Sequence, residues 1–291
     1  MKVKQITVLS GKGGTGKTTI ACSLARILEQ CVLIDADADC PDVAGYMTGT
    51  KVASVPVKGM GLSARITDEC IGCGICIESC QFKAIYVDRE SHKAHIIDYL
   101  CRGCELCSFV CPVDAVYIVS SPTGEINISL TQKGAVISPV ITQAQGSAKI
   151  ITIMKIIGQE ICFKTGLQYI VIDGPPGIGC NVIAALTGAD VSLIIIEPTV
   201  SALFDLKRVL SLIEHFKISV CVCINKSGIN QPIEQEIETF CTETGTPIIA
   251  RIPFNEKIID FVDQGNYLSD FPDKRITTAV FEIISRITGS K

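Results

Sequence analysis

The chain has 291 residues, of which 47 % are hydrophobic and 19 % are charged, and its formal net charge is −4. This length suits one large α/β domain or two smaller ones, with enough apolar residues for a sizeable core. A weakly acidic chain has no overall attraction for nucleic acid or for an anionic membrane. We therefore expect no nucleic-acid partner.

The N-terminal sequence and the cysteine content indicate the compartment. No long apolar segment follows Met1, and no apolar run reaches the ~20 residues of a membrane-spanning helix. We therefore expect a cytoplasmic protein without a stable membrane anchor. In that compartment, the 16 cysteines favour metal ligation over disulfides.

The first predicted elements are a strand, a glycine-rich loop and a helix. The apolar run Ile6–Leu9 precedes the loop, and the helical pattern Ile20–Leu28 follows it. This is the context of a phosphate-binding loop, whose backbone N–H groups turn inward around a polyphosphate at the start of a helix. Lys17 would reach the outer phosphates, and the Thr18 hydroxyl would ligate Mg²⁺. The loop residues predicted to contact the nucleotide are Gly11, Gly13, Gly14, Thr15, Gly16, Lys17, Thr18 and Thr19.

The second predicted strand, Val32–Ile34, leads directly into Asp35, Asp37 and Asp39. Ligands of an open α/β sheet bind beyond the carboxyl ends of its strands, so these aspartates are well placed. We predict that Asp37 orients or activates the water that attacks the γ-phosphate. Capping or loop solubility is the alternative for Asp35 and Asp39, and for Asp39 it explains the residue at least as well.

A cysteine repeat with a period of 31 residues follows. Its two runs, each spaced CxxCxxCxxxC, begin at Cys70 and Cys101, and a duplicated supersecondary unit is the usual cause of such a repeat. The spacing resembles that of bacterial ferredoxins with two [4Fe–4S] clusters, in which the fourth cysteine of each run ligates the other cluster. This resemblance implies one ligand set of Cys70, Cys73, Cys76 and Cys111 and a second set of Cys101, Cys104, Cys107 and Cys80.

Zinc is the competing metal, because thiolates favour both zinc and iron–sulfur clusters. Four-cysteine zinc sites usually consist of two separated CxxC pairs, so the tandem runs favour two clusters. One departure is Gln81, which stands where Pro112 stands in the second run. It leaves the turn after Cys80 less defined and removes no ligand.

Beyond the repeat, helices and strands alternate to the end of the chain. The connection Glu125–Gln145 is predicted to be rich in strands, and the final amphipathic helix, near Ile276–Ile287, to pack on the core. Strands that alternate with helices at this spacing predict a parallel sheet with right-handed crossovers. The elements expected between them are helix Ala148–Lys164, strand Tyr169–Ile172, strand Val191–Ile196, helix Ser201–Phe216, strand Ser219–Ile224, helix Ile233–Thr244 and strand Ile248–Ile252.

Two further polar residues follow predicted strands. Asp173 opens the sequence Asp-Gly-Pro-Pro-Gly, and an aspartate in this place can hold Mg²⁺ or a water bound to it. The turn after Asp173 could sense the γ-phosphate. Asn225 closes the strand Ser219–Ile224, where an amide can recognise the nucleobase.

The expected fold is a doubly wound, mostly parallel α/β sheet of the P-loop type, interrupted by an inserted α+β domain like a bacterial ferredoxin. Residues 1–61 and 121–291 would form the two parts of the nucleotide-binding domain. Residues 62–120 would form the inserted domain with its two [4Fe–4S] clusters.

Together, the glycine-rich loop, Asp35-Ala36-Asp37, the Asp173 turn and Asn225 resemble the MinD/ParA superfamily of P-loop ATPases, and the cysteine repeat narrows this to the branch with a ferredoxin insertion. The resemblance covers essentially the whole chain and implies ATP and Mg²⁺ as ligands. It implies that Lys12 reaches the partner's phosphates across a nucleotide-dependent homodimer. It also implies that Lys12, Lys17 and Asp37 are catalytic, that Asp173 lies behind the metal ligands, and that Asn225 reads adenine.

Cys180 differs from the other cysteines outside the repeat, because it lies seven residues after Asp173 in a loop expected to move with nucleotide state. The nitrogenase iron protein of the same superfamily has a similar offset, and its cysteine binds a cluster at the dimer interface. Cys180 could therefore face the dimer axis, although a packed small residue is the simpler explanation. The cysteines expected to be small core residues are Cys22, Cys31, Cys162, Cys221 and Cys223.

Three functions fit these features. ATP hydrolysis could control electron transfer through the clusters to a redox or iron–sulfur protein; the chain could be an iron–sulfur cluster carrier or scaffold; or it could be a positioning or partitioning switch with redox-sensing clusters. Complete ligation of two clusters favours electron transfer, because a carrier needs an exposed, labile cluster. The weak acidity and the lack of a basic terminal helix count against the switch.

Overall fold

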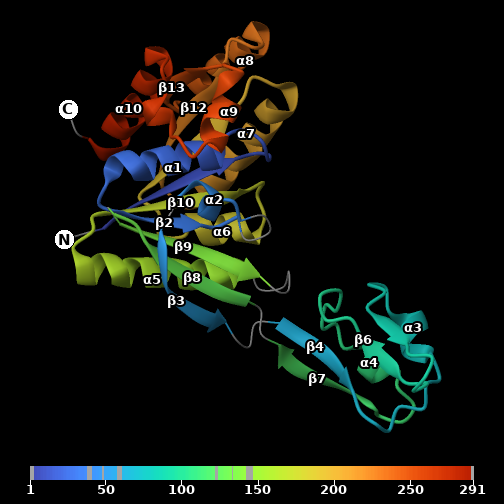
Figure 1. Ribbon diagram of the computed structural model, residues 1–291. Coiled ribbons are helices and arrows are strands. Elements are labelled where there is room, and N and C mark those ends of the chain that lie inside the picture. Colours follow the sequence, from blue (N-terminus) through green and yellow to red (C-terminus); the bar gives the residue numbers. More distant parts are fainter. Residues whose placement is uncertain are drawn as a thin grey trace. The chain divides into compact units, whose positions relative to one another are not determined.

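The computed structural model describes residues 3–37, 41–47, 49–57, 61–121, 124–132, 134–141 and 147–289 (Figure 1). The chain forms two compact units. Unit one comprises Met1–Ser54, Asn127–Pro139 and Ile151–Lys291, and unit two comprises Val55–Ile126 and Val140–Ile150. No helix within the described residues is both long and apolar enough to cross a membrane.

Unit one is built on a nine-stranded sheet with the strand order β13-β12-β11-β1-β10-β2-β9-β8-β3, whose β3, β8 and β9 each include residues of unit two. The pairs β13–β12, β12–β11, β11–β1, β1–β10, β10–β2 and β2–β9 are parallel. This confirms the expected mostly parallel sheet. The strands are β1 (Lys4–Ser10), β2 (Cys31–Asp35), β3 (Thr50–Val57), β8 (Gly124–Leu130), β9 (Gly134–Ile141), β10 (Tyr169–Pro176), β11 (Val191–Ile196), β12 (Ser219–Ser227) and β13 (Ile248–Pro253).

Helices cover both faces of this sheet. One core joins α1 and α10 to Ile6 and Val8 of β1, and the other joins α6, α7 and α8 to Leu9 of the same strand. Adjacent strand residues point to opposite faces, and β1, β11 and β12 each contribute buried residues to both cores. The helices are α1 (Lys17–Leu28), α2 (Val43–Tyr46), α5 (Ser147–Thr165), α6 (Cys180–Leu186), α7 (Val200–Glu214), α8 (Gln231–Glu243), α9 (Lys257–Asp263) and α10 (Lys274–Thr288), with a 3₁₀ turn at Leu268–Asp270.

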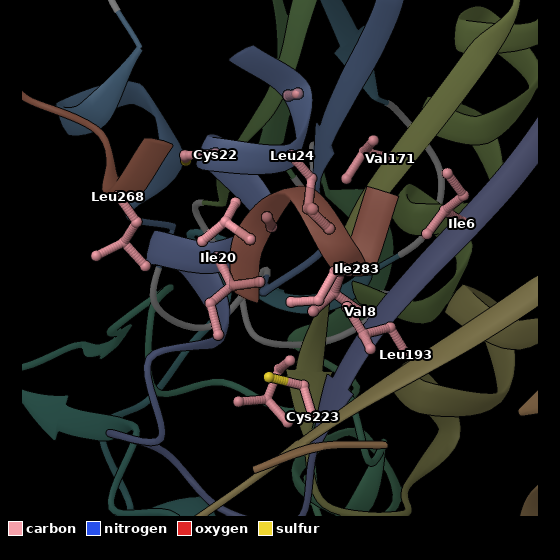
Figure 2. Close-up of a cluster of buried hydrophobic side chains, with 14 of the residues drawn as sticks. Ile6, Val8, Ile20, Cys22, Leu24, Val171, Leu193, Cys223, Leu268 and Ile283 are labelled. Carbon is pink, nitrogen blue, oxygen red and sulfur yellow. The ribbon is translucent and has the colours of Figure 1, made fainter. Parts of the chain in front are cut away.

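The expected core cysteines are buried. Figure 2 shows Cys22 and Cys223 among aliphatic side chains of the first core. Burial raises the pKa of Cys31 to about 12 and that of Cys162 to about 11, so neither thiol ionises near neutral pH. Cys221 is also buried, which confirms that all five are packing residues.

The predicted strands and helices of the alternating region are all present, with ends shifted by a few residues. The connection Glu125–Gln145 does contain two strands, β8 and β9, although residues 142–146 lie outside the described part. The sequence pattern missed α6 and α9, because helices of seven residues span too few turns to show a period.

Unit two contains two small antiparallel strand pairs. β4 (Gly61–Ile66) pairs with β7 (Val116–Ser121), and β5 (Ile85–Val87) pairs with β6 (Ala94–Ile96). Each cysteine run carries one short helix, α3 (Ile75–Ser79) in the first and α4 (Leu106–Phe109) in the second, and these helices contact each other. The duplicated arrangement mirrors the repeat in the sequence.

Candidate functional site

The glycine-rich loop runs from the end of β1 to the start of α1, as its sequence predicts. Gly16 has a φ of 85°, and a Cβ on it would lie 2.4 Å from Asn225 Nδ2. A Cβ on Gly11 would lie 2.1 Å from the Cβ of Asp205. Both positions therefore require glycine, and the helix N-terminus that follows is of the kind that binds phosphate through its backbone N–H groups.

Asp173 holds the two side chains predicted to bind the phosphates and Mg²⁺. Lys17 Nζ donates to Asp173 Oδ1 at 2.9 Å, and Thr18 Oγ1 donates to Asp173 Oδ2 at 2.6 Å. Burial raises the pKa of Asp173, whereas Lys17 and Thr18 act in the opposite direction. Asp173 thus lies behind the two side chains and orients both of them.

Asp37 and Asp35 have different places in the structure. Asp37 Oδ2 lies 3.9 Å from Nζ of Lys17, the residue predicted to bind the outer phosphates. Asp35 is fully buried and accepts hydrogen bonds from the backbone N–H groups of Asp37, at 3.3 Å, and Val43, at 3.0 Å. Asp35 therefore anchors the two ends of the segment that carries Asp37. Asp39 lies outside the described residues.

Lys12 makes a contact that the sequence pattern did not reveal. Its Nζ lies 2.7 Å from Glu197 Oε1, and the other carboxylate oxygen of Glu197 lies 2.8 Å from Lys226 Nζ. Lys226 also donates to the carbonyl of Gly14 at 3.0 Å. Burial raises the pKa of Glu197, but hydrogen bonds from Lys12 and Lys226 lower it on balance. Glu197 follows an apolar strand as Asp173 does, and that signal could have identified it.

A cavity of about 950 Å³ lies beside the loop. Its wall includes all the predicted nucleotide-site and catalytic residues except Gly11 and Asp173, and it continues to the apolar side chains of Phe254, Ile258 and Ile259. Asn225 Nδ2 donates to the carbonyl of Thr15 at 2.7 Å, which places the amide in this wall. Thr15 Oγ1 is buried without a hydrogen-bond partner, so a polar ligand fits there.

Cys180 is exposed and is the first residue of α6. It also belongs to the wall of this cavity, with Gly179 and Asn181 beside it. The structure therefore places Cys180 next to the predicted phosphate loop and not in the core.

The eight repeat cysteines surround two small cavities in unit two. Each cavity has three cysteines from one run and the fourth cysteine from the other run. Among the described residues, no group of three or more His, Cys, Asp or Glu side chains is arranged to hold a single metal ion. The first cavity is lined by Cys70, Cys73, Cys76 and Cys111, and the second by Cys80, Cys101, Cys104 and Cys107.

Backbone N–H groups point at the sulfurs of both sets. Ala94 N lies 3.5 Å from Cys70 Sγ, and Ala115 N lies 3.3 Å from Cys111 Sγ. The second set has the matching contacts, from Ala64 N to Cys101 Sγ at 3.5 Å and from Ala84 N to Cys80 Sγ at 3.4 Å. These donors stabilise negative charge on sulfur, as thiolate ligands require.

Burial and the neighbouring Cys70 and Cys73 raise the pKa of Cys76. Soft thiolate donors with N–H groups directed at their sulfurs are the type of set that iron–sulfur and zinc centres use.

A family match identifies the nucleotide-binding fold. Residues 6–268 match the family described as the CobQ/CobB/MinD/ParA nucleotide binding domain. The chain belongs to this family. It is accordingly a P-loop ATPase of the MinD/ParA type with a nucleotide-binding domain.

Three similar proteins illustrate the match. An uncharacterized protein of Methanocaldococcus jannaschii is 32% identical over 233 residues, which are 78% of this chain and 80% of that protein. The cytosolic Fe–S cluster assembly factor NBP35 of Eremothecium gossypii is 29% identical over 139 residues, 42% of each chain. The septum site-determining protein MinD complexed with Mg-ADP, from Pyrococcus horikoshii, shares the fold with a TM-score of 0.59 at 15% identity, over 98% of this chain and 96% of MinD.

Proposed function

We propose that this ATPase is an iron–sulfur protein in which a nucleotide-dependent homodimer controls electron transfer through two [4Fe–4S] clusters to a redox or iron–sulfur protein partner. The observation that carries the proposal is the crossed pairing of cysteines, three from one run and one from the other, around each cavity of unit two. Bacterial two-cluster ferredoxins have this ligand arrangement. Residues 62–120 would then be the inserted cluster domain, between ATPase segments 1–61 and 121–291.

The cysteine sets would hold the clusters, and the paired N–H contacts to sulfur would help to set their potentials. A bound [4Fe–4S] cluster supplies one-electron chemistry at each set. Two glycines of the cysteine runs allow another backbone segment to pack closely against them. A Cβ on Gly72 would lie 2.0 Å from the carbonyl oxygen of His92, and one on Gly103 would lie 2.4 Å from that of Leu62.

The nucleotide cavity would supply the switch. Lys17 would bind the outer phosphates, Thr18 would ligate Mg²⁺, and Asp37 would orient the attacking water. The partner's Lys12 would add positive charge at the γ-phosphate, so hydrolysis would be slow in the monomer and faster in the dimer. Asn225 donates its amide N–H to the phosphate loop, which leaves Oδ1 free to accept from the amino group of adenine.

A second candidate function is that of a cluster carrier or assembly scaffold. Its support is the match to NBP35, a cluster assembly factor, which covers 42% of each chain. The exposed Cys180 in the nucleotide cavity would then be a candidate ligand for a transient cluster. Electron transfer is preferred because the eight repeat cysteines of unit two would form two complete ligand sets without Cys180.

Anaerobic purification followed by metal and sulfide analysis tests the clusters. The proposal expects about eight iron and eight sulfide ions per chain. Zinc at about two ions per chain without sulfide would overturn it.

A second experiment separates the two functions. The cluster-loaded protein is incubated anaerobically with ATP and an apo-ferredoxin, and in a parallel sample it is pre-reduced and mixed with ATP and an oxidised cluster-containing ferredoxin. Electron transfer predicts retention of the protein's own iron and ATP-dependent reduction of the oxidised acceptor. Transfer of iron and sulfide to the apo-ferredoxin would support the carrier and contradict electron transfer.

A further inference from the structure

Lys155 is a buried lysine in the middle of α5. The residue is only 6 % exposed, and its Nζ lies 3.0 Å from the carbonyl oxygen of Ala184 and 3.0 Å from that of Ala185. It also donates to the carbonyl of Thr187. An ammonium group has three donors and no acceptor, so these carbonyls match its full hydrogen-bonding capacity.

The three carbonyls lie at one end of α6. Ala184 and Ala185 are in its last turn and Thr187 is its C-terminal cap. The carbonyls that end a helix carry partial negative charge, which a cation stabilises. Burial lowers the pKa of Lys155 to about 8, and the side chain is therefore mostly charged at neutral pH. An apolar side chain would fill the same space without this desolvation cost. We therefore expect Lys155 to fix the position of α6 against α5 more than it stabilises the fold.

The opposite end of α6 reaches the nucleotide cavity. Gly179, Cys180 and Val182 belong to the cavity wall, and the turn predicted to sense the γ-phosphate directly precedes them. With seven residues, α6 is only ~10 Å long, and it will move as one rigid piece. Thr7 of β1 adds a further anchor at the distal end, where its hydroxyl donates to the carbonyl of Ala185 at 3.1 Å.

α5 is the helix by which the chain returns from unit two. Residues up to Ile150 group with unit two, and residues from Ile151 group with unit one. Lys155 lies on the next turn after that change. Figure 1 shows α5 and α6 on the same side of the sheet, opposite α1. Lys155 therefore connects α6, which lines the nucleotide cavity, to α5, which continues from unit two.

We propose that Lys155 is a positioning residue that transmits the nucleotide-dependent position of α6 to α5. The inference rests on nucleotide binding by the family fold and not on the clusters. Protein without iron would overturn the proposed electron transfer and leave this inference intact.

Hydrogen–deuterium exchange of the full chain tests it, with ADP or with a non-hydrolysable ATP analogue, both with Mg²⁺. The wild-type protein should show exchange in peptides of 147–165 that differs at least about threefold between the two nucleotides. Lys155→Met should lose this difference while it still binds both nucleotides. Lys155→Arg, which keeps donors for the carbonyls, should retain it. The matched control is Lys164→Met, which removes an exposed lysine of the same helix that pairs with Glu160.

Two results would overturn the proposal. One is equal exchange of α5 with the two nucleotides in the wild-type protein, a measurement that needs no variant to fold. The other is a Lys155→Met protein that is less stable than wild type but keeps the full nucleotide difference in α5, because a residue that only supports the fold would behave in this way.

Discussion

Lys12 is held by Glu197 of its own chain, with 2.7 Å between Lys12 Nζ and Glu197 Oε1. The same carboxylate binds Lys226, which donates to the carbonyl of Gly14 in the phosphate loop. Weak contacts from Lys12 Nζ to the hydroxyls of Thr199 and Ser201, both at 3.4 Å, add to this arrangement. A lysine that is to reach a partner's phosphates must first leave these groups.

Lys12→Ala should abolish ATP hydrolysis and largely spare ATP binding. The cavity keeps Lys17 and the loop N–H groups for the phosphates, whereas a positive charge directed at the γ-phosphate would be lost from the transition state. We expect kcat to fall by about 10²-fold or more, and the Kd for a fluorescent ATP analogue to change by less than about threefold. Lys164→Ala on the exposed face of α5 is the control and should keep wild-type kcat. Strong hydrolysis by Lys12→Ala would rule out the dimer mechanism.

Glu197→Gln should strengthen dimerisation, because Lys12 would no longer have to separate from a negatively charged side chain to reach the partner's phosphates. Lys12 is about a third exposed in this pair, so screening keeps its contribution below ~1 kcal/mol. We therefore expect hydrolysis to reach half its maximum at a protein concentration about two- to fivefold lower than in the wild type. The measurement is specific ATPase activity over a dilution series. A shift to higher concentration would show that Glu197 assists the dimer.

Much of the nucleotide site could be predicted because its signals are local. Gly16, Lys17 and Thr18 are adjacent in the chain, and an aspartate after an apolar strand marks the sheet edge wherever that strand lies. Glu197 carries the same signal, but its meeting with Lys12 depends on the pairing of β11 with β1. No periodicity in the sequence encodes strand order, so this contact could not be derived.

Contacts between distant parts of the chain also explain why the sequence did not locate β9 and did not reveal the role of Lys155. β9 pairs with β2, and its consecutive residues Val136 and Ile137 are both buried because helices cover the two faces of the sheet. Such a strand shows no alternation, and the sequence could only indicate strands in this region. Lys155 is one lysine in a helical pattern, and its role depends on the C-terminal end of a helix too short to predict.

Cysteine double variants test the crossed ligand sets. Cys111→Ser should lose about half of the iron, because Cys111 lies with the first run around one cavity. Adding Cys73→Ser should cause little further loss, whereas adding Cys104→Ser should remove most of the remaining iron. Iron and sulfide are measured after identical anaerobic reconstitution. Cys162→Ala, a substitution in the core, is the control and should keep the full content.

The opposite result has a clear meaning. If each run binds its own cluster, Cys111→Ser with Cys104→Ser will lose no more iron than Cys111→Ser alone. The crossed arrangement would then be wrong even if two clusters are present.

Asp35 should make the stability of the nucleotide-free protein fall as the pH rises. Burial, with Asp173 as the second cause, raises the pKa of Asp35 to about 7, whereas an unfolded aspartate has a pKa of about 3.9. Between these values the folded state binds more protons than the unfolded state, so the free energy of unfolding decreases with pH. The stabilisation is complete below about pH 4 and is lost as the pH rises through about 7, by at most about 4 kcal/mol.

Asp35→Asn should remove this dependence. The amide retains only one acceptor oxygen for the N–H groups of Asp37 and Val43, which costs roughly 1 kcal/mol at every pH. Relative to the variant, the wild-type protein should therefore lose melting temperature between pH 5 and pH 8, measured without nucleotide or Mg²⁺. Asp260→Asn, an exposed substitution on α9, should keep the wild-type slope. Parallel curves for wild type and Asp35→Asn would mean that Asp35 is ionised throughout this range and that Lys17 compensates both buried carboxylates.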